Sequence, residues 1–186
     1  MRWAEFNPGR GDLVVTANQD GTAQIWNWRT GEQLKALAEP SGEGVNDAFF
    51  SPDWRTVLTA TDAGVARLWS VDSGKELRQF PVPGRTQVFN VAFGDHGRWV
   101  MTCGNNGASI FDAESGQRLT DFPYGSSISD CEFSPDGRLV VAAGLSGETR
   151  IYSTEMARGI GHLKAIAPKL LTTRLTPAQR RQYGVG

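Results

Sequence analysis

The side chains best suited to chemistry in this 186-residue sequence are two histidines and two cysteines. His96 and His162 are far apart in the chain, and neither lies at a metal-ligand spacing. Cys103 and Cys131 fall in segments predicted as strands, where a buried cysteine usually acts as a small hydrophobic residue. Two cysteines alone supply neither a disulfide framework nor a four-ligand zinc site. A cysteine paired with His96 is the one nucleophilic arrangement left, and we predict that it does not operate.

Motifs for phosphate binding and for nucleophilic hydrolysis are also missing from the sequence. No glycine-rich loop ends in Lys-Ser or Lys-Thr. Residues 144–147 (Gly-Leu-Ser-Gly) have the wrong spacing for a nucleophile elbow and align with a hairpin turn instead. Asp47 and Asp130 occupy equivalent predicted strands, and we expect them to line a water-filled central channel rather than to act as acid and base. The sequence therefore predicts no enzyme, no cofactor and no metal site.

The overall composition is that of an ordinary globular protein. Hydrophobic residues make up 39% of the chain and charged residues 21%. No apolar run approaches the roughly 20 residues that cross a bilayer. The first residues lack the layout of a secretory signal. We therefore expect a cytoplasmic protein that is not in a membrane.

The near-zero net charge conceals two oppositely charged parts. All 20 acidic residues lie between Glu5 and Glu155, and 13 of the 19 basic ones lie in residues 1–157, which gives this body a charge of 13 − 20 = −7. From Arg158 onward there are six basic residues and no acidic one. Because phosphate binding needs clustered Lys and Arg, the acidic body argues against a nucleic-acid partner. The basic tail could dock on the acidic body, contact an acidic partner or remain solvated.

The sequence contains four copies of one pattern of short strands and turns. An aromatic residue ends an alternating apolar and polar run in each copy, at Trp26, Trp69, Phe111 and Tyr152, with spacings of 43, 42 and 41. Dipeptides such as Asp20-Gly21 precede these runs and suit tight hairpins. Each copy predicts four antiparallel strands in about 42 residues, which is one blade of a β-propeller.

These copies resemble WD40 repeats from roughly Arg2 to His162. The matching segments include residues 20–27 (Asp-Gly-Thr-Ala-Gln-Ile-Trp-Asn) and 133–138 (Phe-Ser-Pro-Asp-Gly-Arg). The resemblance implies an all-β, WD40-like β-propeller with four four-stranded antiparallel blades. The blades would cover residues 1–163, at about 2–43, 44–86, 87–126 and 127–163, with sixteen strands and almost no helix before Glu155.

The hydrogen-bonded tetrad of the WD40 family is complete in no copy. The first copy offers Asp20, Thr16 and Trp26 but no histidine. We therefore expect the blades to rest on apolar packing more than on this network. Trp99 aligns with Leu13 and is predicted to lie in the core.

The segment 164–186 is predicted to be a basic tail with a short helix. Thr176 and Gln179 form a capping box with Pro177 at the first helical position, and Gly184 can end the helix. The tail resembles the C-terminal tail of large bacterial multidomain WD40 proteins, which often join an ATPase or protease domain to a sensory propeller.

Four blades are fewer than the roughly seven that usually close a WD40 ring, and an open arc leaves two sheet faces uncovered. Met1 also falls directly at the first strand of a blade. A partner chain could complete the ring, the chain could be the C-terminal piece of a longer protein, or four blades could close alone; we favour the first two. Two copies joined head to tail would give an eight-bladed ring with twofold symmetry, while a hetero-complex would complete the ring with a different chain.

The resemblance implies that the loops at the two ends of the blades bind peptides or protein surfaces. The candidate partner-binding residues are Trp54 and Arg55 at one end, with Glu43 and Arg85 at the other. We expect the loop of residues 38–45, which includes Glu39, to be accessible. Trp54 replaces the glycine found at position 137, so it is either a binding hot spot or a lid over a neighbouring turn.

The predicted function is a non-catalytic scaffold for protein–protein interaction. The alternative is a sensor segment of a bacterial signalling or defence protein whose NTPase or protease domain lies upstream or on another chain.

Overall fold

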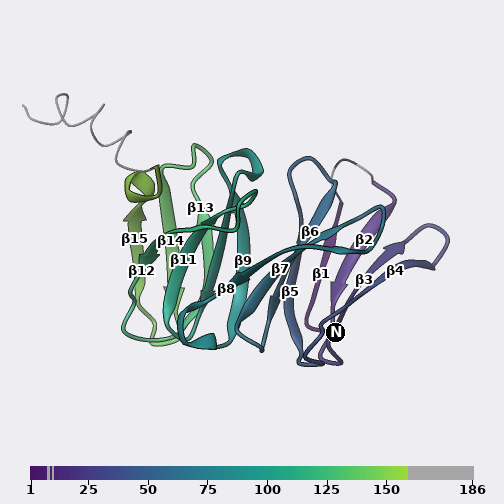
Figure 1. The fold of residues 1–186 in the computed structure, drawn as a ribbon, viewed down its shortest axis with the longest axis horizontal. Helices are drawn as coiled ribbons and strands as arrows, with labels where there is room; N and C mark the ends of the chain where they lie inside the picture. Colours follow the sequence, from purple (N-terminus) through teal and green to yellow (C-terminus); the bar gives the residue numbers. More distant parts are fainter. Residues whose placement is uncertain (8, 10, 159–186) are drawn as a thin grey trace, which may run out of the picture.

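The computed structural model describes residues 1–7, 9 and 11–158, except for the side chain of Arg85. Strands in this part of the chain form four antiparallel sheets, arranged in chain order from right to left in Figure 1. The first sheet is β1(Trp3–Phe6), β2(Leu13–Ala17), β3(Thr22–Asn27) and β4(Glu32–Ala38), and the second is β5(Val45–Phe50), β6(Thr56–Thr61), β7(Val65–Ser70) and β8(Glu76–Pro81). The third is β9(Val88–Gly94), β10(Trp99–Gly104), β11(Gly107–Asp112) and β12(Arg118–Phe122), and the fourth is β13(Ile128–Phe133), β14(Leu139–Gly144) and β15(Thr149–Ser153). The prediction of an all-β partial propeller is confirmed.

The four sheets repeat one register, as the spacing of the aromatic residues predicts. In each sheet the repeat aromatic pairs with a valine of the preceding strand: Val14 with Trp26, Val57 with Trp69, Val100 with Phe111, and Val140 with Tyr152. Because side chains alternate along a strand, this shared register turns the same face of each sheet toward the sheet before it.

Three apolar clusters fill the spaces between neighbouring sheets. Ile25 of the first sheet packs in one cluster with Phe50 and Trp69 of the second. The second and third sheets share a cluster in which the rings of Phe80 and Phe111 lie 5.6 Å apart. The third and fourth sheets share the cluster that contains Trp99, which is 4% exposed, so its predicted place in the core is confirmed.

Two sheets have a hydrogen bond between the repeat tryptophan and a threonine, as the resemblance predicts for this pair of positions. The indole Nε1–H of Trp26 donates to Thr16 Oγ1 at 3.2 Å, and that of Trp69 donates to Thr59 Oγ1 at 3.0 Å. Both bonds join the second and third strands of their sheet. They add to the apolar packing and do not replace it.

In the third and fourth sheets, the residue types remove this bond. Thr102 occupies the equivalent threonine position, but Phe111 has no N–H group, and the buried Thr102 hydroxyl has no partner among the described residues. Tyr152 instead donates its hydroxyl to the carbonyl oxygen of Pro123 at 3.0 Å. Neither of these two sheets therefore has the hydrogen bond between its second and third strands that Trp26 and Trp69 make.

Asp20 acts within its own turn. Its carboxylate accepts hydrogen bonds from the backbone N–H of Thr22 at 3.0 Å and from the hydroxyl of the same residue at 2.6 Å. These bonds, that of the hydroxyl most of all, lower the pKa of Asp20. The residue stabilises the hairpin between β2 and β3.

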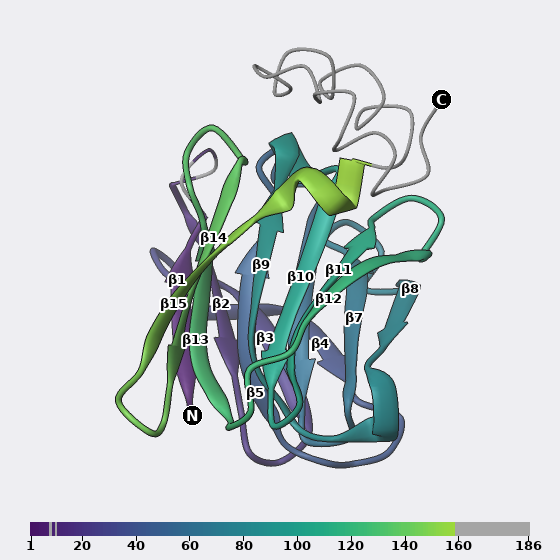
Figure 2. The ribbon, with the colours of Figure 1, turned by 90° about the vertical axis from the view of Figure 1, so that its left-hand side faces the viewer.

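The described helices are short 3₁₀ turns: η1(Pro83–Arg85), η2(Asp95–Gly97) and η3(Thr154–Arg158). The fourth sheet has three strands in the described part of the chain, and η3 follows β15 and turns back onto the third sheet, as Figure 2 shows. The sixteenth strand and the C-terminal helix of the sequence prediction lie outside the described residues.

Candidate interaction surfaces

The first strands of all four sheets line one groove with a volume of about 810 Å³. β1, β5, β9 and β13 each contribute side chains to its wall. Aromatic residues dominate the apolar part; Trp3 and Phe49, for example, lie with ring centroids 5.3 Å apart. The expected central channel is therefore present as an open groove along the inner strands.

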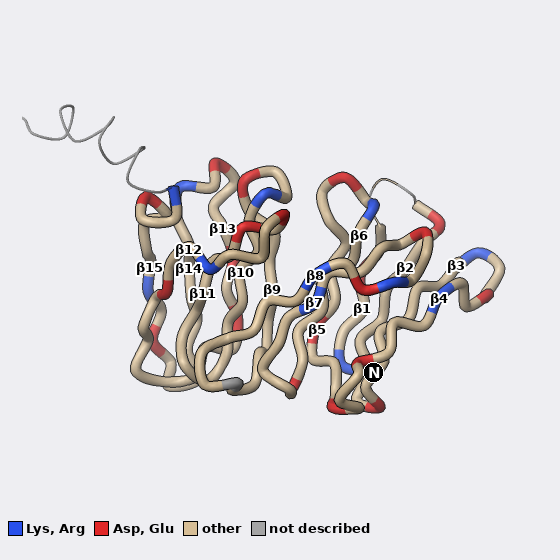
Figure 3. Tube along the Cα trace, in the orientation of Figure 1, with Lys and Arg blue, Asp and Glu red and all other residues tan. Residues whose placement is uncertain are grey.

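The charged residues that line this groove are all acidic. Glu5, Asp47, Asp130 and Glu132 lie in its wall, and none of its described lining residues is Lys or Arg. Arg2 lies at the rim: its Nη1 donates to Asn46, which lines the groove, and lies 3.1 Å from Asp62 Oδ2. Most other charged residues lie in loops and turns at the strand ends (Figure 3). The groove is thus an acidic and aromatic surface.

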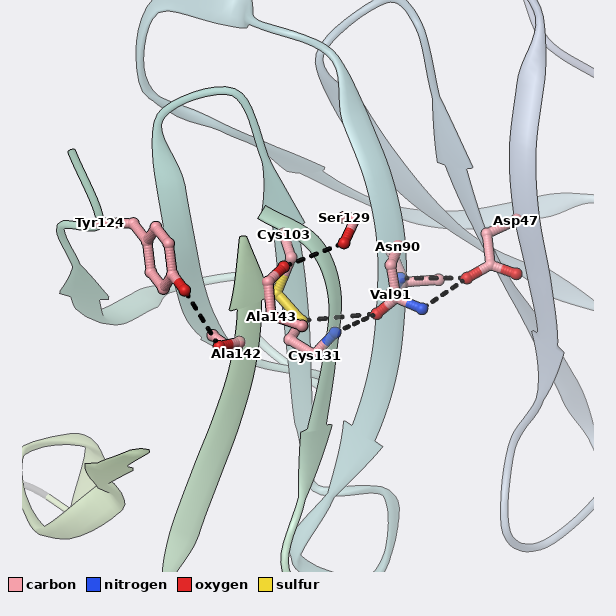
Figure 4. The surroundings of a disulfide bond; sticks show 9 residues. All are labelled: Asp47, Asn90, Val91, Cys103, Tyr124, Ser129, Cys131, Ala142 and Ala143. Carbon is pink, nitrogen blue, oxygen red and sulfur yellow. Dashed lines mark hydrogen bonds between the residues drawn. A yellow bond between two sulfur atoms is a disulfide. The ribbon is translucent and has the colours of Figure 1, made fainter. Parts of the chain in front are cut away.

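Polar contacts join the inner strands around the groove. The backbone N–H of Phe50 in β5 donates to Glu5 of β1 at 2.9 Å. Asn90 of β9 donates its amide to Asp47 of β5 at 3.0 Å, and its carbonyl oxygen accepts from the backbone N–H of Cys131 in β13 at 3.3 Å (Figure 4). Each bond crosses from one sheet to the next, so these polar groups set the spacing of the sheets at the groove.

The prediction that the two cysteines act as small hydrophobic residues is wrong. Cys103 of β10 and Cys131 of β13 form a disulfide that joins the third sheet to the fourth (Figure 4). Their Cα atoms lie 6.4 Å apart across the intersheet core, within the range that a disulfide can bridge. Sequence spacing could not reveal the pair, because the sheets bring together residues separated by 28 positions. The disulfide also leaves Cys103 no thiol with which to form a nucleophilic pair with His96.

Asp47 is the most deeply buried carboxylate of the groove, at 3% exposure. Burial raises the pKa of Asp47 to about 7, although the N–H groups of Val91 and Ala48 donate to its carboxylate and oppose the shift. The negative charges of Asp130 and Glu5 raise the pKa further. Both predicted residues line the groove, but they differ in exposure: Asp130 is exposed, whereas Asp47 is buried in the wall.

This burial predicts a falling stability as the pH rises. The folded state keeps a proton on Asp47 up to about pH 7, whereas the unfolded chain loses it near pH 4. The free energy of unfolding should therefore fall by roughly 2 kcal/mol between pH 5 and pH 7. Urea denaturation at several pH values measures this slope. Asp47→Asn should flatten it, and an unchanged slope in that variant would contradict the assignment.

The first sheet has an uncovered apolar face. Phe6 is 62% exposed, whereas Phe50, at the same repeat position in the second sheet, is 5% exposed because the first sheet covers it. Trp26 is half-buried, whereas its equivalent Trp69 is 6% exposed. Trp28 lies beside Phe6 with ring centroids 6.1 Å apart and belongs to the same face. We call Phe6, Trp26 and Trp28 the leading face. Its large apolar side chains are of the kind that the second sheet buries against the first.

The fourth sheet has the complementary uncovered face, which is turned to the viewer in Figure 2. Leu139, Val141 and Ile151 are 44%, 39% and 68% exposed. Their equivalents in the first sheet, Leu13, Val15 and Ile25, are 5%, 0% and 1% exposed because the second sheet covers them. We call Leu139, Val141 and Ile151 the trailing face. The row of four sheets therefore has an apolar face exposed at each end, and the equivalent faces are buried where one sheet packs on the next.

Trp54 lies in the turn between β5 and β6 and packs over the backbone at Gly9. A Cβ atom added to Gly9 would overlap the indole ring of Trp54. Trp54 has a φ of +63°, close to the +65° of Gly137 in the fourth sheet, so its backbone adopts a conformation that favours glycine. The ring is half-buried against the first intersheet cluster and also lines the groove. It covers a neighbouring turn and keeps part of its surface accessible.

The four candidate partner-binding residues lie at opposite ends of the sheets. Arg55 is exposed beside Trp54 in the β5–β6 turn. Glu43 is exposed in the β4–β5 loop at the other end, and the backbone of Arg85 ends η1 at that same end. Two of them therefore lie at each end of the sheets, and the four do not form one site.

Glu39 was expected to be accessible, and this expectation is wrong. It is 5% exposed, and its carboxylate accepts from Arg67 Nε at 2.7 Å. Arg67 also donates through Nη1 to Glu76 at 2.8 Å. This buried cluster ties the loop after the first sheet to the second sheet. Local sequence patterns could not predict this cluster, because its three residues come from separate segments of the chain.

The comparison with protein families supports the resemblance seen in the sequence. Residues 116–153 match the family model "WD domain, G-beta repeat". The match covers β12, the last strand of the third sheet, and the three strands of the fourth. No curated protein matched the chain.

Among the described residues, no helix is long and apolar enough to cross a bilayer, and no cluster of three or more His, Cys, Asp or Glu could hold a metal ion.

Proposed function

Because the chain carries a WD40 repeat within a row of WD40-like blades, we propose that it is a non-catalytic scaffold for protein–protein interaction. WD40 domains generally mediate such contacts and are generally not catalytic. The observation that carries the proposal is the pair of uncovered apolar faces, since both consist of residues that are buried elsewhere in the repeat. The loops at the two strand ends offer further, more polar contact surfaces.

We propose that a second copy completes the ring. The leading face of one copy would pack on the trailing face of the other, and the twofold axis would repeat this contact to give eight blades. The repeat register supports this arrangement, because each interior blade already makes the same contact with its neighbour. A different chain that supplies further blades is the hetero-complex version of the same proposal.

Light scattering in solution tests the dimer, because it measures the mass of the assembly. We expect a mass near twice 20.2 kDa for the full chain. Ile151→Asp should shift the mass toward a single copy, because it places a charge at the centre of the trailing face. Leu77→Asp is the matched control: Leu77 is 51% exposed on β8, away from both end faces, and its replacement should leave the dimer intact. A folded single copy for the unaltered chain would overturn the dimer.

Affinity capture tests the scaffold itself. We expect the chain to retain specific protein partners and Trp54→Ala/Arg55→Ala to lose those that bind the β5–β6 end. Glu43→Ala/Arg85→Ala should lose only partners of the opposite end. If neither pair changes what is captured, the loop faces are not the binding surfaces.

The uncovered leading face also favours the second candidate, a sensor segment whose NTPase or protease domain lies upstream or on another chain. In that case, further blades encoded upstream would cover Phe6 and Trp28. The upstream reading frame distinguishes the two candidates. We also propose a cytoplasmic location.

A further inference from the structure

We infer that the groove along the inner strands is the docking site of the chain's own basic segment, residues 159–186. This inference concerns occupancy of the groove within one chain and does not depend on how the ring is completed. The basic residues of the segment are Lys164, Lys169, Arg174, Arg180 and Arg181, and it contains no Asp or Glu.

The charge and chemistry of the groove fit a cationic peptide. Asp130 and Glu132 are exposed in its wall, and neither forms a salt bridge within the described part of the chain. Aromatic rings such as that of Trp3, which is 42% exposed, lie in the same wall and can pack against the faces of guanidinium groups. A volume of about 810 Å³ accommodates several side chains of an extended peptide.

The last described element, η3, packs against β12 at the outer edge of the third sheet. The guanidinium carbon of Arg158 lies 5.3 Å from the ring centroid of Trp99. The Trp99 ring in turn lies 6.2 Å from that of Phe133, and Phe133 lines the groove. Trp99 and Phe133 of the intersheet core therefore lie between Arg158 and the groove, a separation that the 28-residue basic segment is long enough to cover. Fully extended, it could span about 90 Å, several times the length of one strand.

The covalent connection favours this occupant over a free peptide of the same chemistry. A tethered segment has an effective concentration in the millimolar range, so even a weak contact is largely formed. A basic partner peptide would then have to displace the segment from the groove.

Zero-length carbodiimide cross-linking of the full chain tests the inference. The reagent joins lysine amines to carboxylates that touch them, so Lys164 and Lys169 should be linked to Asp130 or Glu132. The exposed Glu32 and Glu114, outside the groove, are the internal controls. Mixing ¹⁵N-labelled and unlabelled chains separates links within a chain from links between chains. Links between chains, or links spread over all exposed carboxylates, would overturn the inference.

A binding measurement gives a second, independent readout. A labelled synthetic peptide of residues 159–186 is titrated against the full chain in which the five basic residues of the segment are replaced by Gln. The peptide should bind this chain and should bind the unaltered chain about tenfold more weakly, because its own segment occupies the groove.

The matched variants locate the contact. Adding Asp130→Asn/Glu132→Gln to the Gln-substituted chain should weaken peptide binding about tenfold, as two lost charge contacts would. Glu32→Gln/Glu114→Gln removes the same charge outside the groove and should leave binding unchanged. Equal losses in the two pairs would show attraction to net charge alone and would contradict a groove site.

Discussion

Arg67→Ala is expected to lower the free energy of unfolding by about 3–5 kcal/mol. The Arg67 side chain is 8% exposed and that of Glu39 is 1% exposed, with 2.7 Å between Nε and Oε2. Removing the guanidinium would leave the buried Glu39 carboxylate without its cation. Because Glu39 follows β4 and Arg67 lies in β7, the variant should weaken the packing of the first sheet on the second. Guanidinium denaturation followed by tryptophan fluorescence measures the loss.

Two further variants test the cause of this loss. Arg67→Met/Glu39→Gln removes both charges and should recover a substantial part of the stability, since no buried ion remains unpaired. Arg118→Ala breaks an exposed pair with Asp121, whose side chains are 45% and 48% exposed, and should cost at most about 1 kcal/mol. If Arg67→Ala cost no more than Arg118→Ala, the buried pair would not stabilise the contact between the sheets.

Breaking the Cys103–Cys131 disulfide is expected to cost about 3–4 kcal/mol in oxidised protein. The bond closes a loop with a sequence separation of 28, and its loss restores the freedom of that loop in the unfolded chain. Cys103→Ala/Cys131→Ala should lower the denaturation midpoint. The unaltered protein should approach the same midpoint once a reductant has been added.

Alkylation provides the control for this prediction. Denatured, unreduced protein should take up no thiol reagent, and reduced protein should take up two equivalents per chain. Two equivalents without reductant would contradict the disulfide. The fourth sheet should be the part most affected by reduction, because its described part has three strands and one covered face.

Much of the fold could be predicted because it depends on a pattern repeated locally. The spacing of Trp26, Trp69, Phe111 and Tyr152 indicates a repeating unit, and glycine turns limit where each strand can end. Such patterns arise from the alternation of side chains along a strand, which neighbouring residues suffice to specify. The loss of the tetrad hydrogen bond in the third sheet also follows from residue type, since Phe111 has no N–H group to donate.

The candidate site could be predicted only in part. The grouping of Asp47 and Asp130 on inner strands follows from the repeat, and both line the groove. The burial of Asp47 does not follow, because Asn90 and Val91 of the next sheet cover it. The division of Trp54 and Glu43 between opposite ends follows from strand order, whereas the packing of Trp54 over Gly9 required the neighbouring sheet.

The sequence by itself determined the repeat, the strand order within each sheet and the opposite charges of body and tail. These features depend on residue type and on spacing within a copy. Only the tertiary structure decided the Cys103–Cys131 bond, the burial of Glu39 with Arg67, and which repeat residues stay uncovered. Each of these depends on how two sheets pack face to face. The sequence pattern of one copy specifies its own strands but not which residues of the next sheet contact them.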